Sequence, residues 1–234
     1  IEEIFNNNSE VPPEYLAGNR EIKNTCYIVV TSCRGLCGGF NNNIIKEAEK
    51  DFHEDWEKPV IVAIGTKGKE YFEKRGYEIY KEYLAPPEDI SFLETREISK
   101  PIIDMYDRGE IDEIVLIYTG FKNSIEQEVK NVILLPFDIQ PDPDILIHDQ
   151  EVEYEPSVEE VFNYLVPKYV EMMIYAAVVE SATCEHAARR LAMENATDNA
   201  SDMLGSLSQY YNRARQAEIT DEIIEIVAGA EAQK

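Results

Sequence analysis

The sequence predicts the α/β class: a Rossmann-like three-layer domain with about five strands, followed by one very long C-terminal helix. From Thr25 to about Val132, short apolar runs alternate with amphipathic stretches, the pattern of a sheet with helices on both faces. From Ser157 to about Val227, helix-forming residues dominate, and only Pro167 and Gly205 interrupt them. We therefore expect an N-terminal tail over 1–20, an α/β domain ending in an acidic linker over 21–155, and the long helix over 156–234.

The strands are predicted from five short apolar or alternating runs. The first reads CYIVV over Cys26–Val30, and its continuous apolar character is typical of a strand buried on both faces. The remaining runs are 60–64, 77–83, 113–118 and 129–134.

The helices between these strands are predicted from caps and from helical spacing of apolar residues. Asn41–Asn43 are expected to cap the first helix, because asparagine side chains accept hydrogen bonds from free helix N–H groups. Gly65 and Gly76 bound the second helix. A third helix is expected from about Ile90 to Tyr106, closing at Gly109.

The C-terminal segment is too long to be buried by a domain of this size. About 70 continuous helical residues would extend on the order of 100 Å. Apolar residues recur along it at a spacing of three and four, with Thr183, His186, Arg190 and Thr197 in the same register. The apolar positions are Met172, Ala176, Val179, Met193, Ala200, Leu204, Leu207, Tyr211 and Ala214. We expect this helix to need a partner helix, and since the sequence begins at Ile1, we expect that partner in an N-terminal piece that is missing here.

Charge and composition exclude several classes. The chain carries 46 acidic and 22 basic side chains, a formal net charge of −24, which repels nucleic acid and anionic lipid alike. No apolar run approaches the roughly 20 residues that span a bilayer. The four cysteines form no CxxC pair and the three histidines are scattered, so we expect no metal site, no disulfide scaffold and a reducing cytosolic compartment. The segment from Lys130 to Lys168 contains no Lys or Arg between its ends, and it is either a solvated acidic surface or a docking face for a basic partner.

A glycine-rich loop follows the first predicted strand. Its glycines are Gly35, Gly38 and Gly39, in the sequence RGLCGGFN. A loop between a strand and a helix can bind phosphate, but this one lacks both the Lys-Ser/Thr of a P-loop and the GxGxxG spacing. We interpret it as a structural turn and expect no cofactor and no catalytic residue. Catalysis by Cys33 or Cys37 would need a positioned base, and no histidine lies nearby in sequence.

Three stretches of the sequence resemble one known family. TSCRGLCGGFNNNI over Thr31–Ile44, ENATDNASDM over Glu194–Met203 and YNRARQAEITDEIIEIVAGAEA over Tyr211–Ala232 are similar to signatures of the gamma subunits of F-type ATP synthases. The resemblance extends from Cys26 to the C-terminus. Cys33 departs from the pattern, since the family has aspartate there.

The resemblance implies a non-catalytic rotor. Such a central stalk couples proton-driven rotation of a membrane ring to ATP synthesis, and its C-terminal helix forms an antiparallel coiled coil with an N-terminal helix. The implied partners are the alpha and beta subunits, the epsilon subunit and the membrane c-ring, with no nucleic acid and no direct insertion into lipid. The implied location is peripheral, at the cytoplasmic face of a bacterial membrane.

Particular residues can be matched to the family's contacts. Those matched to the contact with the catalytic subunits, or lying beside it, are Arg189, Arg215, Gln216, Thr220 and Glu222. Those matched to the contact with the membrane ring are Tyr154, Glu155 and Pro156. Each of the helical positions could instead be an ordinary exposed residue.

Two other functions remain open from the sequence. The chain could be a free-standing α/β domain that binds an anion or nucleotide at the Gly loop and dimerises through its helix. It could also be a coiled-coil adaptor that binds helical partners without changing an enzymatic rate.

Overall fold

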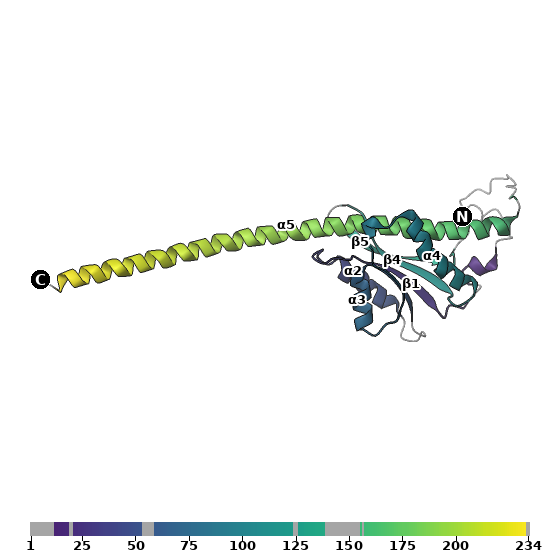
Figure 1. Cartoon of the computed structure of the whole chain (residues 1–234), viewed down its shortest axis with the longest axis horizontal. Coiled ribbons are helices and arrows are strands. Elements are labelled where there is room, and N and C mark those ends of the chain that lie inside the picture. The colour runs from purple at the N-terminus through teal and green to yellow at the C-terminus, as the bar shows by residue number, and fades with distance from the viewer. Residues whose placement is uncertain are drawn as a thin grey trace. The chain divides into compact units, whose positions relative to one another are not determined.

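The computed structural model describes residues 12–18, 21–52, 59–123, 126–138, 155 and 157–232. The helices and strands follow the predicted order (Figure 1). In chain order they are η1 (Pro13–Tyr15), β1 (Thr25–Val30), α2 (Phe40–Asp51), β2 (Val60–Ile64), α3 (Thr66–Lys74), β3 (Ile79–Tyr83), η2 (Pro87–Asp89), α4 (Phe92–Asp107), β4 (Glu113–Phe121), β5 (Gln127–Leu135) and α5 (Val158–Glu231).

The five strands form one sheet in the order β3-β2-β1-β4-β5. β1 pairs in parallel with both β2 and β4, so that Tyr27 lies between Ile61 and Val115. β5 is antiparallel to β4 and forms one edge. The central strand β1 is buried along its whole length, as its continuous apolar sequence predicted.

Helices cover both faces of this sheet, which confirms the three-layer prediction. On one face, α2 and α3 pack around Tyr27, Val29 and Phe72. On the other face, α4 and the first part of α5 pack around Ile28, Ile102 and other apolar residues (Figure 1). Because alternate strand residues point to opposite faces, Tyr27 and Ile28 belong to different cores.

The predicted cap of α2 is wrong. The helix begins at Phe40, and its N-cap is Gly39, which makes no side-chain cap hydrogen bond. Asn41 lies inside the first turn, and its side chain turns back to Ser32 at the end of β1. A tertiary contact therefore uses the amide that the sequence pattern assigned to capping.

The long helix is confirmed as a single element of 74 residues, with Pro167 inside it. It belongs to two compact units, one ending at Arg189 and the other beginning at Arg190. In the first unit its inward face is buried, with Phe162, Val166 and Val170 in the core. In the second unit every described side chain is exposed except Ala192, which is half-buried. The second unit thus has almost no packing of its own.

None of the helices among the described residues is both long and apolar enough to cross a bilayer.

Candidate functional site

The Gly loop between β1 and α2 is held in one conformation by its own side chains. The Ser32 backbone N–H donates to Asn41 Oδ1 at 2.9 Å, and Asn41 Nδ2 donates back to Ser32 Oγ at 2.7 Å. Leu36 has a φ of 63° and Gly38 a φ of 59°, and this left-handed region is costly for leucine. The loop is therefore a fixed turn tied at both ends to secondary structure.

The side-chain amide of Asn41, in the first turn of α2, is engaged by the Gly loop. Besides Ser32, it donates to Cys37 Sγ at 3.3 Å, so its hydrogen bonds are made within the loop. Arg34 is exposed. This arrangement favours the structural interpretation of Gly35, Gly38 and Gly39, which stays a prediction.

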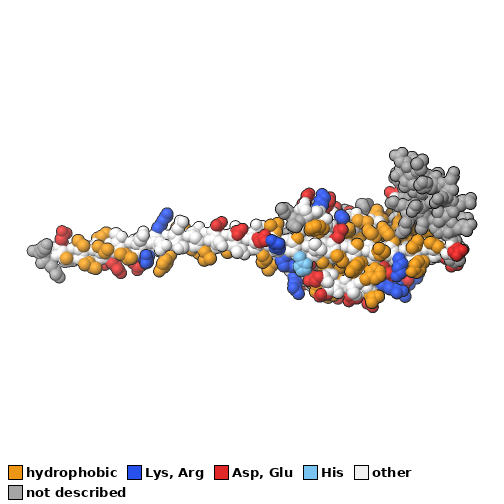
Figure 2. All heavy atoms as spheres, turned by 90° about the horizontal axis from the view of Figure 1, so that it is seen from above, with side chains coloured by type: hydrophobic (Ala, Val, Ile, Leu, Met, Phe, Trp, Pro, Cys, Tyr) orange, Lys and Arg blue, Asp and Glu red, His pale blue; other side chains and the backbone are white. Residues whose placement is uncertain are grey.

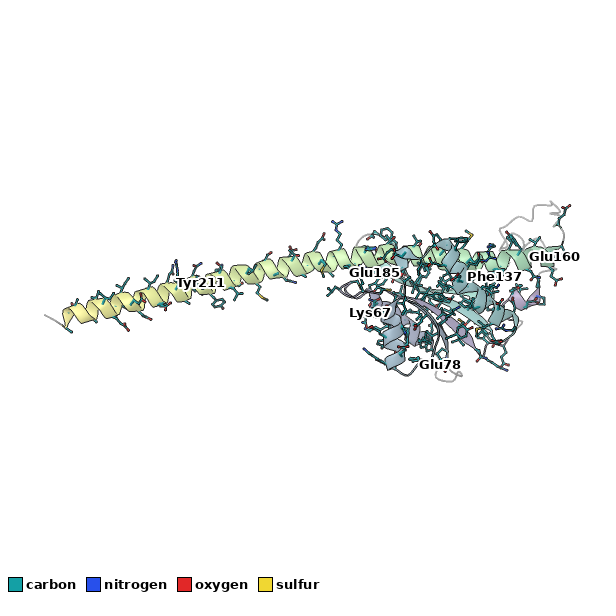
Figure 3. The ribbon with its side chains drawn as sticks, viewed as in Figure 1. Lys67, Glu78, Phe137, Glu160, Glu185 and Tyr211 are labelled. Carbon is teal, nitrogen blue, oxygen red and sulfur yellow. The ribbon has the colours of Figure 1, made fainter. Side chains whose placement is uncertain are left out.

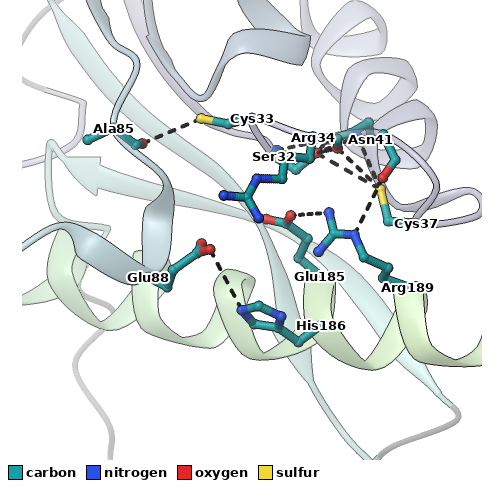
Figure 4. Close-up of polar contacts among 11 residues, drawn as sticks. Ser32, Cys33, Arg34, Cys37, Asn41, Ala85, Glu88, Glu185, His186 and Arg189 are labelled. Atoms are coloured by element: carbon teal, nitrogen blue, oxygen red, sulfur yellow. Dashed lines mark hydrogen bonds and ion pairs between the residues drawn. The ribbon is translucent and has the colours of Figure 1, made fainter.

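The long helix contacts this loop through Arg189 (Figure 4). Arg189 Nε donates to the Gly35 carbonyl at 3.4 Å, and its guanidinium forms an ion pair with Glu185, one turn earlier in α5. Glu185 is buried, with 4% of its side chain exposed against 24% for Arg189. On the neighbouring side of the helix, His186 Nε2 lies 3.9 Å from Glu88 Oε1 of η2. Arg189 is thus engaged inside the α/β unit, and its predicted contact with a catalytic subunit stays a prediction.

The four thiols differ in their surroundings. Burial raises the pKa of the Cys26 thiol to about 12. Burial is also the largest cause that raises the pKa of the Cys184 thiol, to about 11. Cys37 is also buried, whereas Cys33 is half-buried and donates to the Leu84 carbonyl at 3.3 Å.

A thiol-reactive dye at pH 8 is expected to modify only Cys33 in the native chain. The reactive species is the thiolate, which burial suppresses in Cys26 and Cys184. Addition of denaturant should release the other three thiols, and Cys33→Ser should abolish the native reaction. Reaction of several thiols at similar rates in the native state would contradict this assignment.

The remaining residues predicted to contact catalytic subunits lie in the second unit and are exposed. At 100° per residue, Arg215 and Glu222 share one side of α5. Gln216 and Thr220 share another, and the Thr220 hydroxyl donates to the Gln216 carbonyl at 2.7 Å. The helix does not bring all four to a single face, so they would meet one partner on two sides or two partners.

Of the residues predicted to contact a membrane ring, Glu155 is exposed. Tyr154 and Pro156 lie outside the described residues.

An apolar seam runs along α5 on the side opposite its buried face. Residues at intervals of seven occupy it, and most of the large ones are exposed. They are Met172, Val179, His186, Met193, Ala200, Leu207 and Ala214. Figure 2 shows hydrophobic side chains along the second unit, and Tyr211 projects from the helix in Figure 3. A strict seven-residue repeat is typical of a left-handed coiled coil, and nothing in the described chain covers the seam there.

These features define a class of protein. An α/β domain whose last helix continues into a unit with an exposed apolar seam is an assembly subunit, built to pair with other helices. A family model described as ATP synthase matches residues 1–233. The chain belongs to the ATP synthase gamma-chain family, as its motifs indicated.

Individual relatives agree over most of the chain. It is 47% identical to the ATP synthase gamma chain of Alkaliphilus metalliredigens over 219 residues, covering 92% of this chain and 75% of that one. It is 39% identical to that of Ruminiclostridium cellulolyticum over 239 residues, covering 99% and 81%. A chain of the central stalk and c-ring structure of Tetrahymena thermophila mitochondrial ATP synthase matches with a TM-score of 0.62 and 26% identity, covering 76% and 78%. A Euglena gracilis mitochondrial ATP synthase chain shares the fold, with a TM-score of 0.70 and 19% identity, covering 94% and 79%.

Two features of the site were missed by sequence reasoning. Glu185 was not singled out, although its position four residues before Arg189 on one helix is the usual spacing of an ion pair. The hydrogen bonds of Asn41 with Ser32 across the Gly loop carried no sequence signal, because they form only when the fold brings the start of α2 next to the residues that follow β1.

Proposed function

We propose that this chain is the central-stalk subunit of an F-type ATP synthase and couples proton-driven rotation of a membrane ring to ATP synthesis. The observation that carries the proposal is the exposed apolar seam on a helix that has almost no packing of its own beyond Arg189. Such a surface needs partner helices. The gamma chains that match most of this sequence, and the rotor structures that share its fold, support the same function.

The chain itself would act by contact and not by catalysis. A single helical shaft inside a ring of alternating alpha and beta subunits presents a different surface to each catalytic subunit. Each subunit then favours the open or closed state that its own contacts stabilise. A contact free energy that differs by 1 to 3 kcal/mol, on the order of allosteric couplings in general, would shift such an equilibrium by about 5-fold to 150-fold. Turning the shaft would pass these preferences around the ring.

The remaining partners follow from the same proposal. The α/β domain would face the epsilon subunit and the membrane c-ring, with Tyr154, Glu155 and Pro156 at the c-ring contact, where a carboxylate can meet basic loop residues. Arg189, Arg215, Gln216, Thr220 and Glu222 would contact the catalytic subunits. The complex would lie at the cytoplasmic face of a bacterial membrane, with this chain peripheral.

The test of this function is assembly with a purified ring of alpha and beta subunits. We expect one copy of the chain, extended by the N-terminal helix of its relatives, to join each ring and to increase the ring's rate of ATP hydrolysis. The chain without that extension is the control, and it tests whether a coiled coil is required for assembly. Failure of both forms to bind or to change the rate would overturn the proposal.

The alternative of an anion-binding domain has its own measurement. Calorimetric titration of the chain with ATP and with inorganic phosphate is expected to show no stoichiometric binding, because the Asn41 amide makes its hydrogen bonds within the Gly loop. Tight binding of one equivalent would favour the alternative.

A further inference from the structure

The last turns of α5 that the α/β unit holds lie at Glu185 to Arg189. The unit boundary falls directly after Arg189, and the described side chains that follow are exposed except that of Ala192. Just before it, Gln127 of β5 donates to the Cys184 carbonyl at 2.9 Å, and Ala188 packs against the core beside α2.

Arg189 and Glu185 form a different kind of contact from the apolar packing around them. The guanidinium holds the buried Glu185 carboxylate and also reaches the Gly35 carbonyl, 154 residues away in sequence (Figure 4). The planar arginine fork offers several donors in fixed directions, so one side chain can fix a carboxylate and a carbonyl together. The loop that receives it is itself fixed by the hydrogen bonds between Ser32 and Asn41.

The next residue provides a built-in comparison. Arg190 forms an ion pair of the same spacing with Glu194 at 2.9 Å, but 81% and 56% of these two side chains are exposed. Exposed pairs contribute little to stability. A buried pair is also a weak source of net stability, since apolar side chains of similar volume do as well, and its better-supported use is to fix one arrangement among several. Glu185 and Arg189 therefore carry a cost of burial that the Arg190 pair avoids.

We propose that Glu185 and Arg189 are positioning residues that lock α5 to the Gly loop within the first unit, so that torque on the α/β domain passes to α5 at this joint. This inference rests on the proposed rotor function. The joint resists twisting because it ties the helix to a loop that is held between β1 and α2, off the helix axis. Apolar contacts alone permit sliding more readily than a directed ion pair and hydrogen bond.

The first test is hydrogen exchange of the chain in solution. The variant Glu185→Leu with Arg189→Met keeps the side-chain volume and removes both the charge pair and the bond to Gly35. We expect amide exchange in residues 32–43 and 182–193 to become about tenfold faster, the factor that corresponds to one lost hydrogen bond of typical strength. The matched control, Glu194→Leu with Arg190→Met, should leave both segments unchanged. If the amide exchange rates of these two segments are the same in both double variants, the proposed joint does not exist.

The second test measures torsional stiffness in the assembled complex. With a probe on the α/β domain and the ring held still, angular fluctuations should widen in the Glu185→Leu, Arg189→Met variant and not in the control pair. If amide exchange becomes faster but the angular fluctuations stay the same, Glu185 and Arg189 have only a structural role, and the proposal is overturned. Failure of the parent chain to assemble would count against the rotor function, and the exchange result would still decide whether the lock exists.

Discussion

Replacing Gly65 with alanine is expected to destabilise the α/β domain by about 4 kcal/mol, most of the free energy of unfolding of a marginally stable chain. Gly65 joins β2 to α3 with φ of 93° and ψ of 147°, a backbone region that only glycine adopts without strain. A Cβ added there would lie 2.1 Å from the Thr31 carbonyl oxygen. The clash is with backbone at the end of β1, so no side-chain rotation relieves it. Urea unfolding followed by circular dichroism measures the loss.

The control for this prediction is Gly76→Ala. Gly76 also has a positive φ, 84°, but an added Cβ would meet nothing within 4 Å. Only the backbone strain then applies, and we expect a loss of about 1 kcal/mol. Similar losses at the two positions would show that the close approach to Thr31 is not what requires glycine.

Placing a carboxylate in the seam with Leu207→Glu is expected to weaken assembly with the ring by about 100-fold or more. In the proposed coiled coil this position would be buried, and an unpaired charge there costs several kcal/mol. In the chain alone Leu207 is 57% exposed, so its unfolding free energy should change by less than about 0.5 kcal/mol. Affinity measured by titration of labelled chain into the ring, beside urea unfolding of the chain alone, separates the two effects.

Gln209→Glu is the matched control, because this position lies on the side of α5 away from the seam and receives the same charge. Assembly should be nearly unchanged by it. If both variants weaken assembly equally, the effect comes from net charge and the seam is not the pairing surface.

The sheet could be predicted well because its central strands are buried on both faces. Residues 60–64 were predicted as a strand, and β2 occupies those residues. β5 extends beyond its predicted ends. It is an edge strand in which exposed and partly buried residues are mixed, so the apolar run in its sequence is shorter than the strand itself.

The first half of α5 was harder to predict from sequence. Phe162, Val166 and Val170 face the sheet, while Met172 and Val179 on the other side are exposed. With apolar residues on two sides, helical periodicity predicts a helix but does not say which side meets the domain. The sequence therefore predicted the helix but not the packing of its first half on the sheet.

The site was predictable only where local sequence carries the information. The motif resemblance selected Arg189 and the glycines, but its bond to Gly35 joins residues 154 positions apart. Asn41 shows the opposite case, where a local signal for capping was overruled by a tertiary contact with Ser32. Contacts between distant segments become visible only once the fold brings them together.

Direct observation of rotation is the most decisive measurement. The ring of alpha and beta subunits is fixed to a surface, and a probe is attached to the α/β domain of this chain, which is extended by the N-terminal helix that the family resemblance implies. The rotor function predicts sustained rotation in one direction when ATP is added, which stops when ATP is removed. Normal ATP hydrolysis by the assembled ring with only random motion of the probe would contradict the rotor function.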